Sequence, residues 1–152
     1  MKRAICVILI IAFLVPVCSL ADSATSLLWM FNFNAKTYGG KQLDESMITE
    51  NTEKRVVFSA DDATIAFAST SGKFKSALVV SADEAEFLPY CLCAAMSVSP
   101  SFNDNALVSF GDLLYCYLTV RSGDESEYGT FGDLRFNIKK DGDNYRFIIG
   151  EK

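Results

Sequence analysis

The sequence of 152 residues contains no histidine. This absence excludes Ser-His-Asp and Cys-His catalysis, zinc sites of the HExxH type, and a side chain that titrates near neutral pH. Any chemistry would depend on carboxylates, tyrosine, lysine or a thiol. No other catalytic signature is present, so we expect a chain that is not an enzyme and that needs no cofactor. A hydrolase that uses paired carboxylates is the rival hypothesis, since their separation in space cannot be read from a sequence.

Positive charge and long apolar runs are also scarce. The chain carries 14 Lys and Arg residues against 19 Asp and Glu residues, a net charge of −5. That balance argues against a nucleic-acid partner, which needs a basic face, and against docking on anionic lipid. Beyond the first 20 residues, no segment is long and apolar enough to span a bilayer.

The N-terminus has the order of a secretory signal. Lys2 and Arg3 precede an apolar run at residues 4–17, and small residues at 19 and 21 fit a peptidase site. We expect a signal peptide at residues 1–21, with the cut after Ala21, and a secreted, periplasmic or cell-surface product with no membrane contact. Loss of the two basic residues changes the net charge to −7. A retained membrane anchor and a lipoprotein modified at Cys18 are the alternatives.

The remaining residues, 22–152, are long enough for a single domain with its own core. Residues 24–38 fit either a helix or a strand, and the glycines that follow favour a helix. Residues 41–54 are polar and without pattern, which indicates a connection. Three strands in a meander are expected at residues 55–59, 64–69 and 73–81.

Two helices are expected next. Ser81 and Glu84 fit a capping box, but proline is costly inside a helix, so the first helix is predicted to begin properly near Leu88, with Pro89 in its first turn. The second is predicted from Asn103 or Asp104 to about residue 118, although its tail "LLYCYLTV" also has the composition of a strand.

The last segment, residues 134–149, predicts a hairpin that turns at Asp141-Gly142. Residues whose numbers sum to about 283 should face each other, which places Phe136 opposite Phe147. The whole pattern predicts an α+β domain. Its antiparallel sheet has about five strands, a three-strand meander plus the C-terminal hairpin, and the helices pack on one face.

Three cysteines follow the predicted cut: Cys91, Cys93 and Cys116. On a helix, residues two apart point about 200° away from each other, so the first two cannot share a metal or form a disulfide together. Three thiols without histidine are also too few for a typical zinc site. We interpret all three as small packing residues. A disulfide from Cys116 to Cys91 or Cys93 is the alternative, although a helical hairpin would place Cys116 level with Glu86 instead.

Two further groups have weak patterns. The acidic residues Asp124, Glu125, Glu127 and Asp133 could hold calcium, but their spacing is irregular and favours a solvated loop. Six aromatic residues could line a groove or a sugar platform, but such spacings more often form core: Trp29, Phe31, Phe33, Tyr90, Tyr115 and Tyr117.

No catalytic, metal-binding or cofactor-binding residue is nominated. The expectation is therefore an exported binding or protein-interaction module, whose partner is a protein or a small molecule. A carrier for a small apolar ligand is an alternative, as is the hydrolase.

Overall fold

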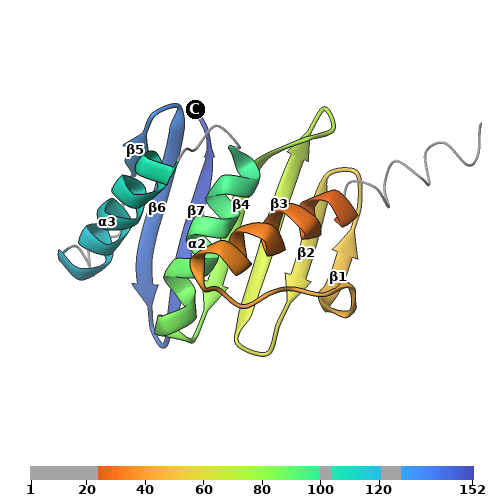
Figure 1. The fold of residues 1–152 in the computed structure, drawn as a ribbon, viewed down its shortest axis with the longest axis horizontal. Coiled ribbons are helices and arrows are strands. Elements are labelled where there is room, and N and C mark those ends of the chain that lie inside the picture. Colours follow the sequence, from red (N-terminus) through yellow and green to blue (C-terminus); the bar gives the residue numbers. More distant parts are fainter. Residues whose placement is uncertain (1–23, 100–103, 121–127) are drawn as a thin grey trace, which may run out of the picture.

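The computed structural model describes residues 24–99, 104–120 and 128–152 (Figure 1). These residues form three α-helices and one antiparallel sheet of seven strands, so the predicted α+β class is confirmed. The strand order is β1-β2-β3-β4-β7-β6-β5. The expectation of about five strands omitted the two short strands at the edges of this sheet.

The elements follow the chain in this order. A helix at residues 24–38 precedes a single 3-10 turn, η1 (Glu45–Met47), and four strands, β1 (Ile48–Asn51), β2 (Arg55–Ser59), β3 (Ala63–Thr70) and β4 (Lys73–Ser81). Two helices come next, α2 (Glu84–Val98) and α3 (Asp104–Val120), and then β5 (Gly129–Phe131), β6 (Leu134–Asp141) and β7 (Asn144–Glu151).

The three predicted meander strands are present as β2, β3 and β4. Ser71 and Gly72, which join β3 to β4, both have positive φ angles (55° and 75°), as a tight hairpin turn with right-handed strand twist requires. Strand β1 lies in the segment predicted as a connection. Its sequence "ITEN" carries no apolar alternation, and it becomes a strand by pairing with β2.

The C-terminal hairpin is confirmed, but its predicted register is wrong. Phe136 pairs with Ile149 and Ile138 pairs with Phe147, so paired numbers sum to 285. The reason is the turn, in which Asp141 still pairs with Asn144 around a loop of two residues that starts at Gly142, with φ of 63°. Strand β5 adds to β6 within the segment predicted as a loop.

The helix at residues 24–38 resolves the ambiguity of that segment in favour of a helix. Helix α2 begins earlier than predicted, at Glu84, because the Asp83 side chain caps it. That side chain accepts hydrogen bonds from the backbone N–H groups of Ala85 and Glu86. Pro89 consequently lies inside the helix, where it removes one backbone hydrogen bond. It lies close to Gly40, where an added Cβ would come within 3.2 Å of the proline Cβ. Ser81, the predicted cap, instead donates to the Asp62 carbonyl.

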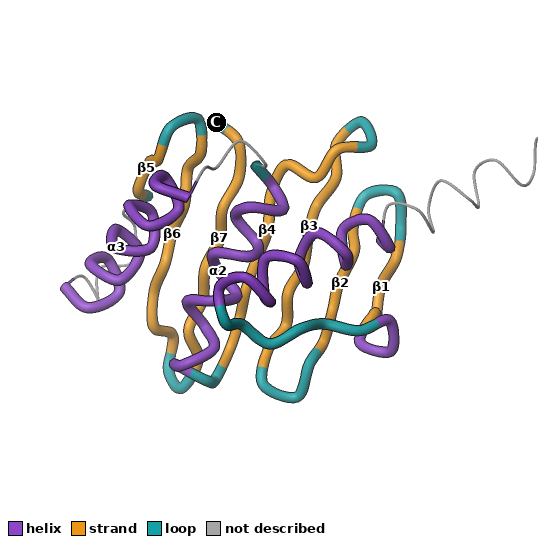
Figure 2. Tube along the Cα trace, viewed as in Figure 1, coloured by secondary structure: helices purple, strands orange, loops and turns teal. Residues whose placement is uncertain are grey.

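Helix α3 continues to Val120, so the strand alternative for its tail is wrong. All three helices lie in front of the sheet in the view of Figures 1 and 2, and they cover the same face. Among the described helices, none is long and apolar enough to cross a membrane.

Aromatic rings fill the space between the helices and the sheet. Phe31 of the N-terminal helix contacts Phe67 of β3 and Tyr90 of α2, with ring centroids 6.4 and 6.2 Å apart. At the other end, Phe110 of α3 contacts Phe136 of β6 at 5.3 Å. All five of these side chains are buried, so the helical layer and one face of the sheet form a continuous core.

Candidate functional site

The face of the sheet that no described helix covers, called here the uncovered face, carries the candidate site. Paired residues of an antiparallel sheet point to the same side, and neighbours along a strand point to opposite sides. One row of paired positions crosses four strands on this face. It consists of Val57 (β2), Ala66 (β3), Leu78 (β4) and Ile148 (β7), named here the apolar row. A solvated sheet face normally alternates to polar residues at such positions.

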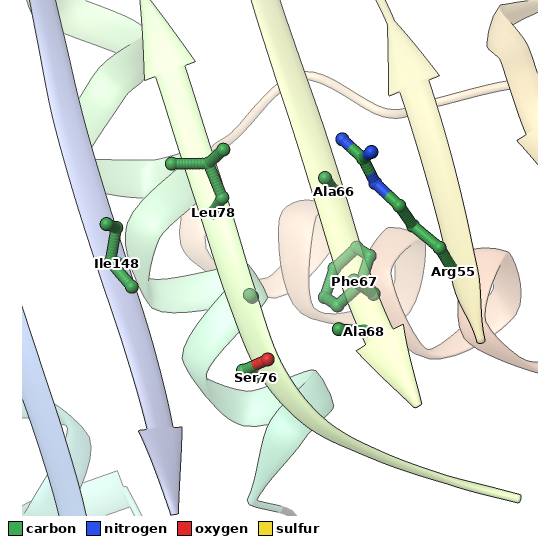
Figure 3. Close-up of a pocket in the computed structure, with 8 residues that line it drawn as sticks. Arg55, Ala66, Phe67, Ala68, Ser76, Leu78 and Ile148 are labelled. Carbon is green, nitrogen blue, oxygen red and sulfur yellow. The ribbon is translucent and has the colours of Figure 1, made fainter. Parts of the chain in front are cut away.

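A shallow hollow of about 240 Å³ opens beside this row (Figure 3). Its floor contains the small residues Ala66, Ala68 and Ser76, and its sides include Leu78 and Ile148. Arg55 of β2 borders it. The hollow exists because adjacent strands carry short side chains here, while longer ones stand around them.

Cations flank the apolar row on both sides. Arg55 and Arg135 belong to the paired row on one side, and Arg146 and Lys139 to the paired row on the other. Glu50, which pairs with Val57, places a carboxylate at the β1 end of the apolar row. In a chain with a net charge of −5, each of the two rows beside the apolar row thus carries two cations.

The surroundings of these cations differ. Arg55 lies 3.6 Å from the carboxylate of Glu50, in an ion pair with both partners well exposed. The guanidinium of Arg135 lies 4.2 Å from the ring centroid of Tyr128, a cation–π contact. Lys139 and Arg146 are directly opposed on β6 and β7. Like charges at opposed positions of a sheet repel each other.

Two of the three cysteines have the predicted packing role, but the prediction is wrong for Cys116, because that position lies on the exposed side of α3. Cys91 and Cys93 are buried in α2 and Cys116 is exposed on α3, and all three thiols are free. Burial raises the pKa of Cys91 well above its ordinary value and that of Cys93 to about 12, so neither is a nucleophile at neutral pH. Both are buried because α2 packs on the sheet and also on the helix at residues 24–38, through Tyr90 and Phe31.

Of the four acidic residues considered for calcium, only Asp133 belongs to the part of the chain that the structure describes. Asp124, Glu125 and Glu127 lie outside the residues that the structure describes, and Asp133 is exposed in the turn between β5 and β6. In the part of the chain that is described, no three residues of the types His, Cys, Asp and Glu come together as metal ligands would.

The six aromatic candidates divide into two groups. Phe31 and Tyr90 are core residues, and Tyr117 is half-buried against Phe136. Trp29 and Phe33 stack on the outer side of the N-terminal helix, with centroids 5.7 Å apart, and Tyr115 is exposed on α3. None of the six belongs to the uncovered face, so they do not form one groove together.

The residues of the uncovered face were not nominated from the sequence. A usable signal is present in the strands that were predicted. Arg135, Lys139, Arg146 and Ile148 occupy alternate positions opposite the core residues of the hairpin. What the sequence did not provide is the pairing of β4 with β7, which brings Leu78 beside Ile148.

Comparison with protein-family models, with characterised proteins and with solved structures finds no significant match to this chain. The geometry of the described residues is therefore the basis for any functional conclusion.

Proposed function

We propose that this chain is a binding module that holds an acidic, amphipathic segment of a partner protein on the uncovered face of its sheet. The observation that carries the proposal is the apolar row with cations on both sides. We further propose that it acts outside the cytoplasm, because residues 1–21 have the order of a secretory signal.

The dimensions of the face suit such a segment. Neighbouring strands lie about 4.8 Å apart, so the four members of the apolar row span roughly 14 Å. The flanking rows begin two residues away along each strand, which is about 7 Å. A segment with apolar side chains on the row would thus hold carboxylates on its two margins close to Arg135 on one side and Arg146 on the other.

Two other occupants fit less well. A second copy of the chain, placed face to face, would bring its own four cations against these four. Single-stranded nucleic acid binds such sheets by stacking bases on aromatic rings. Tyr128 is the aromatic side chain described on this face, and the apolar row is aliphatic.

The same features support a module over an enzyme or a carrier. The uncovered face offers guanidinium and aliphatic groups, which position a ligand but do not exchange protons at neutral pH. A carrier would need an enclosed space between the helices and the sheet. Buried rings such as Phe31, Phe67 and Phe110 occupy that space.

The test is selection of peptides from a random display library on the immobilised protein. We expect the recovered peptides to combine Leu, Ile or Val with Asp or Glu. Their affinity should fall at high salt, because exposed ion pairs are screened. Arg146→Glu should weaken a recovered peptide by about tenfold or more, since it removes a charge-assisted contact and adds repulsion.

The matched control is Lys140→Gln. Lys140 neighbours Lys139 in the chain but points to the helix side of the sheet, where its ammonium lies over the ring of Tyr145. It should leave peptide affinity unchanged. Recovered peptides that are basic, or an Arg146→Glu variant that folds and binds all peptides normally, would contradict the proposal. Binding of a single-stranded oligonucleotide in preference to the peptides would also contradict it.

A further inference from the structure

A second hollow, of about 370 Å³, lies on the helix side of the sheet, away from the uncovered face. It is called here the hairpin cleft, because the β6–β7 hairpin forms its base. The first turn of α2 and the last turns of α3 form its walls. Its lining residues are Glu84, Leu88, Tyr115, Leu118, Thr119, Lys140 and Tyr145.

The polar groups of the hairpin cleft form a short chain. The hydroxyl of Tyr145 donates to Oε2 of Glu84 at 2.6 Å and accepts from Nζ of Lys140 at 3.4 Å. The carboxylate oxygen and the ammonium nitrogen are thus at most 6.0 Å apart, the sum of the two distances. They are farther apart than the 4.0 Å of an ion pair. The Tyr145 hydroxyl therefore bridges the Glu84 carboxylate and the Lys140 ammonium, which do not form a direct ion pair.

Both charged groups keep unused hydrogen-bonding capacity. An ammonium has three donors and a carboxylate has about four acceptor sites, and the tyrosine uses one of each. Leu88, Leu118 and the ring of Tyr115, which is 60% exposed, supply apolar surface beside them. The cleft thus offers an anion, a cation and an apolar wall within the reach of one small molecule.

We infer that the hairpin cleft binds a free α-amino acid with an aliphatic or aromatic side chain. The ligand ammonium would bond to Glu84, its carboxylate to Lys140, and its side chain would lie on Leu88, Leu118 and Tyr115. The separation of the two protein charges fits this ligand, because both of its charged groups are attached to one carbon atom. The inference does not depend on the proposed function, since it concerns the opposite side of the sheet.

The experiment is titration of the full chain with L-leucine and L-phenylalanine, followed by nuclear magnetic resonance. We expect saturable binding with a Kd of about millimolar or tighter, the range for so few ligand atoms. N-acetyl-L-leucine lacks the ammonium and L-leucinamide lacks the carboxylate. Each should bind about tenfold more weakly or worse, because each loses a charge-assisted hydrogen bond.

Variants separate this site from the uncovered face. Lys140→Gln and Glu84→Gln should each reduce affinity for L-leucine by about tenfold or more. Lys139→Gln changes the adjacent lysine on the other side of the sheet and should leave it unchanged. Tyr145→Phe keeps the ring and removes the hydroxyl, so it breaks the hydrogen bonds to Glu84 and Lys140 without creating a cavity.

Three results would overturn the inference. One is the absence of saturable binding of either amino acid at millimolar concentration. Another is equal binding of L-leucine and L-leucinamide. The third is a folded Lys140→Gln variant with unchanged affinity. None of these three results concerns peptide binding at Arg146, so the hairpin cleft and the uncovered face are tested independently of each other.

Discussion

The two faces of the seven-stranded sheet use the same strands in opposite ways. On the covered face, β7 presents Phe147 and Ile149, which are fully buried beneath the helices. On the uncovered face, the same strand presents Arg146 and Ile148, which are only half-buried. Aromatic residues concentrate where two layers enclose them, and small aliphatic and cationic residues remain where one layer stands alone. The comparison teaches that the apolar row differs from the core: Val57 and Ala66 are buried without joining the core cluster, while Leu78 and Ile148 are only half-buried and remain accessible.

The largest expected difference between the faces comes from the two phenylalanines of the hairpin. Phe136→Ala or Phe147→Ala should lower the free energy of unfolding by about 3–5 kcal/mol, because each removes a fully buried ring and leaves a cavity. Urea unfolding of both variants measures it. A loss below about 1 kcal/mol for either ring would show that the covered face is not the core.

A smaller effect is expected where β5 closes the covered face. A methyl group added at Gly129 would overlap the ring of Phe136. Gly129→Ala should therefore cost about 1–3 kcal/mol, the usual range for an overpacked core. Thr130→Ala is the control, because Thr130 is exposed on the same strand and points to the other face. Equal stability of the two variants would mean that β5 does not pack against β6 in this way.

The buried thiols should make the free energy of unfolding fall at alkaline pH. Burial raises the pKa of Cys91 and Cys93 above the ordinary value of 9.0, to about 12 for Cys93, so the native state keeps protons that the unfolded state loses. Stability is fully present below about pH 9 and falls as the pH rises toward 12. The expected slope is about 1.4 kcal/mol per pH unit for each thiol. Unfolding experiments at about pH 8 and about pH 10 would measure it, and Cys91→Ala should reduce the slope.

Alkylation of the native protein compares the same thiols with the exposed one. Cys116 should react, while Cys91 and Cys93 should react only after denaturation, because a thiolate must form and be reached. Peptide mapping by mass spectrometry identifies each position. A linked pair among the three would revive the disulfide alternative, and rapid native labelling of Cys93 would argue against the packing of α2 on the sheet and on the N-terminal helix.

The smallest expected effects belong to the cations of the uncovered face. Arg135→Ala, Lys139→Ala and Arg146→Ala should each change the free energy of unfolding by no more than about 0.5 kcal/mol, as solvent-facing positions do. Thermal melts measure this. A large loss at any of the three would mean that the uncovered face is structural rather than available for binding.

Local sequence pattern was sufficient for most individual elements. Strands β2, β3, β4, β6 and β7 and the helices α2 and α3 each have enough residues of one period to indicate their type. The edge strands β1 and β5 do not, since they have four and three residues and depend on the neighbours that they pair with. The start of α2 was predicted too late, because the sequence shows the cost of Pro89 inside a helix but not the tertiary packing that offsets this cost.

The sequence by itself determined the alternation of the C-terminal hairpin, and therefore that Lys139 and Lys140 must point to opposite sides of the sheet. It also determined that no histidine chemistry is possible. Only the tertiary structure decided which side the helices cover, how β4 joins β7, and that Glu84 meets Tyr145 across 61 positions of the chain. Those are contacts between distant segments. Their free energy comes from burying surface that no local window of the sequence contains. Both candidate sites therefore exist only when the distant strands have paired and the helices have packed on the sheet.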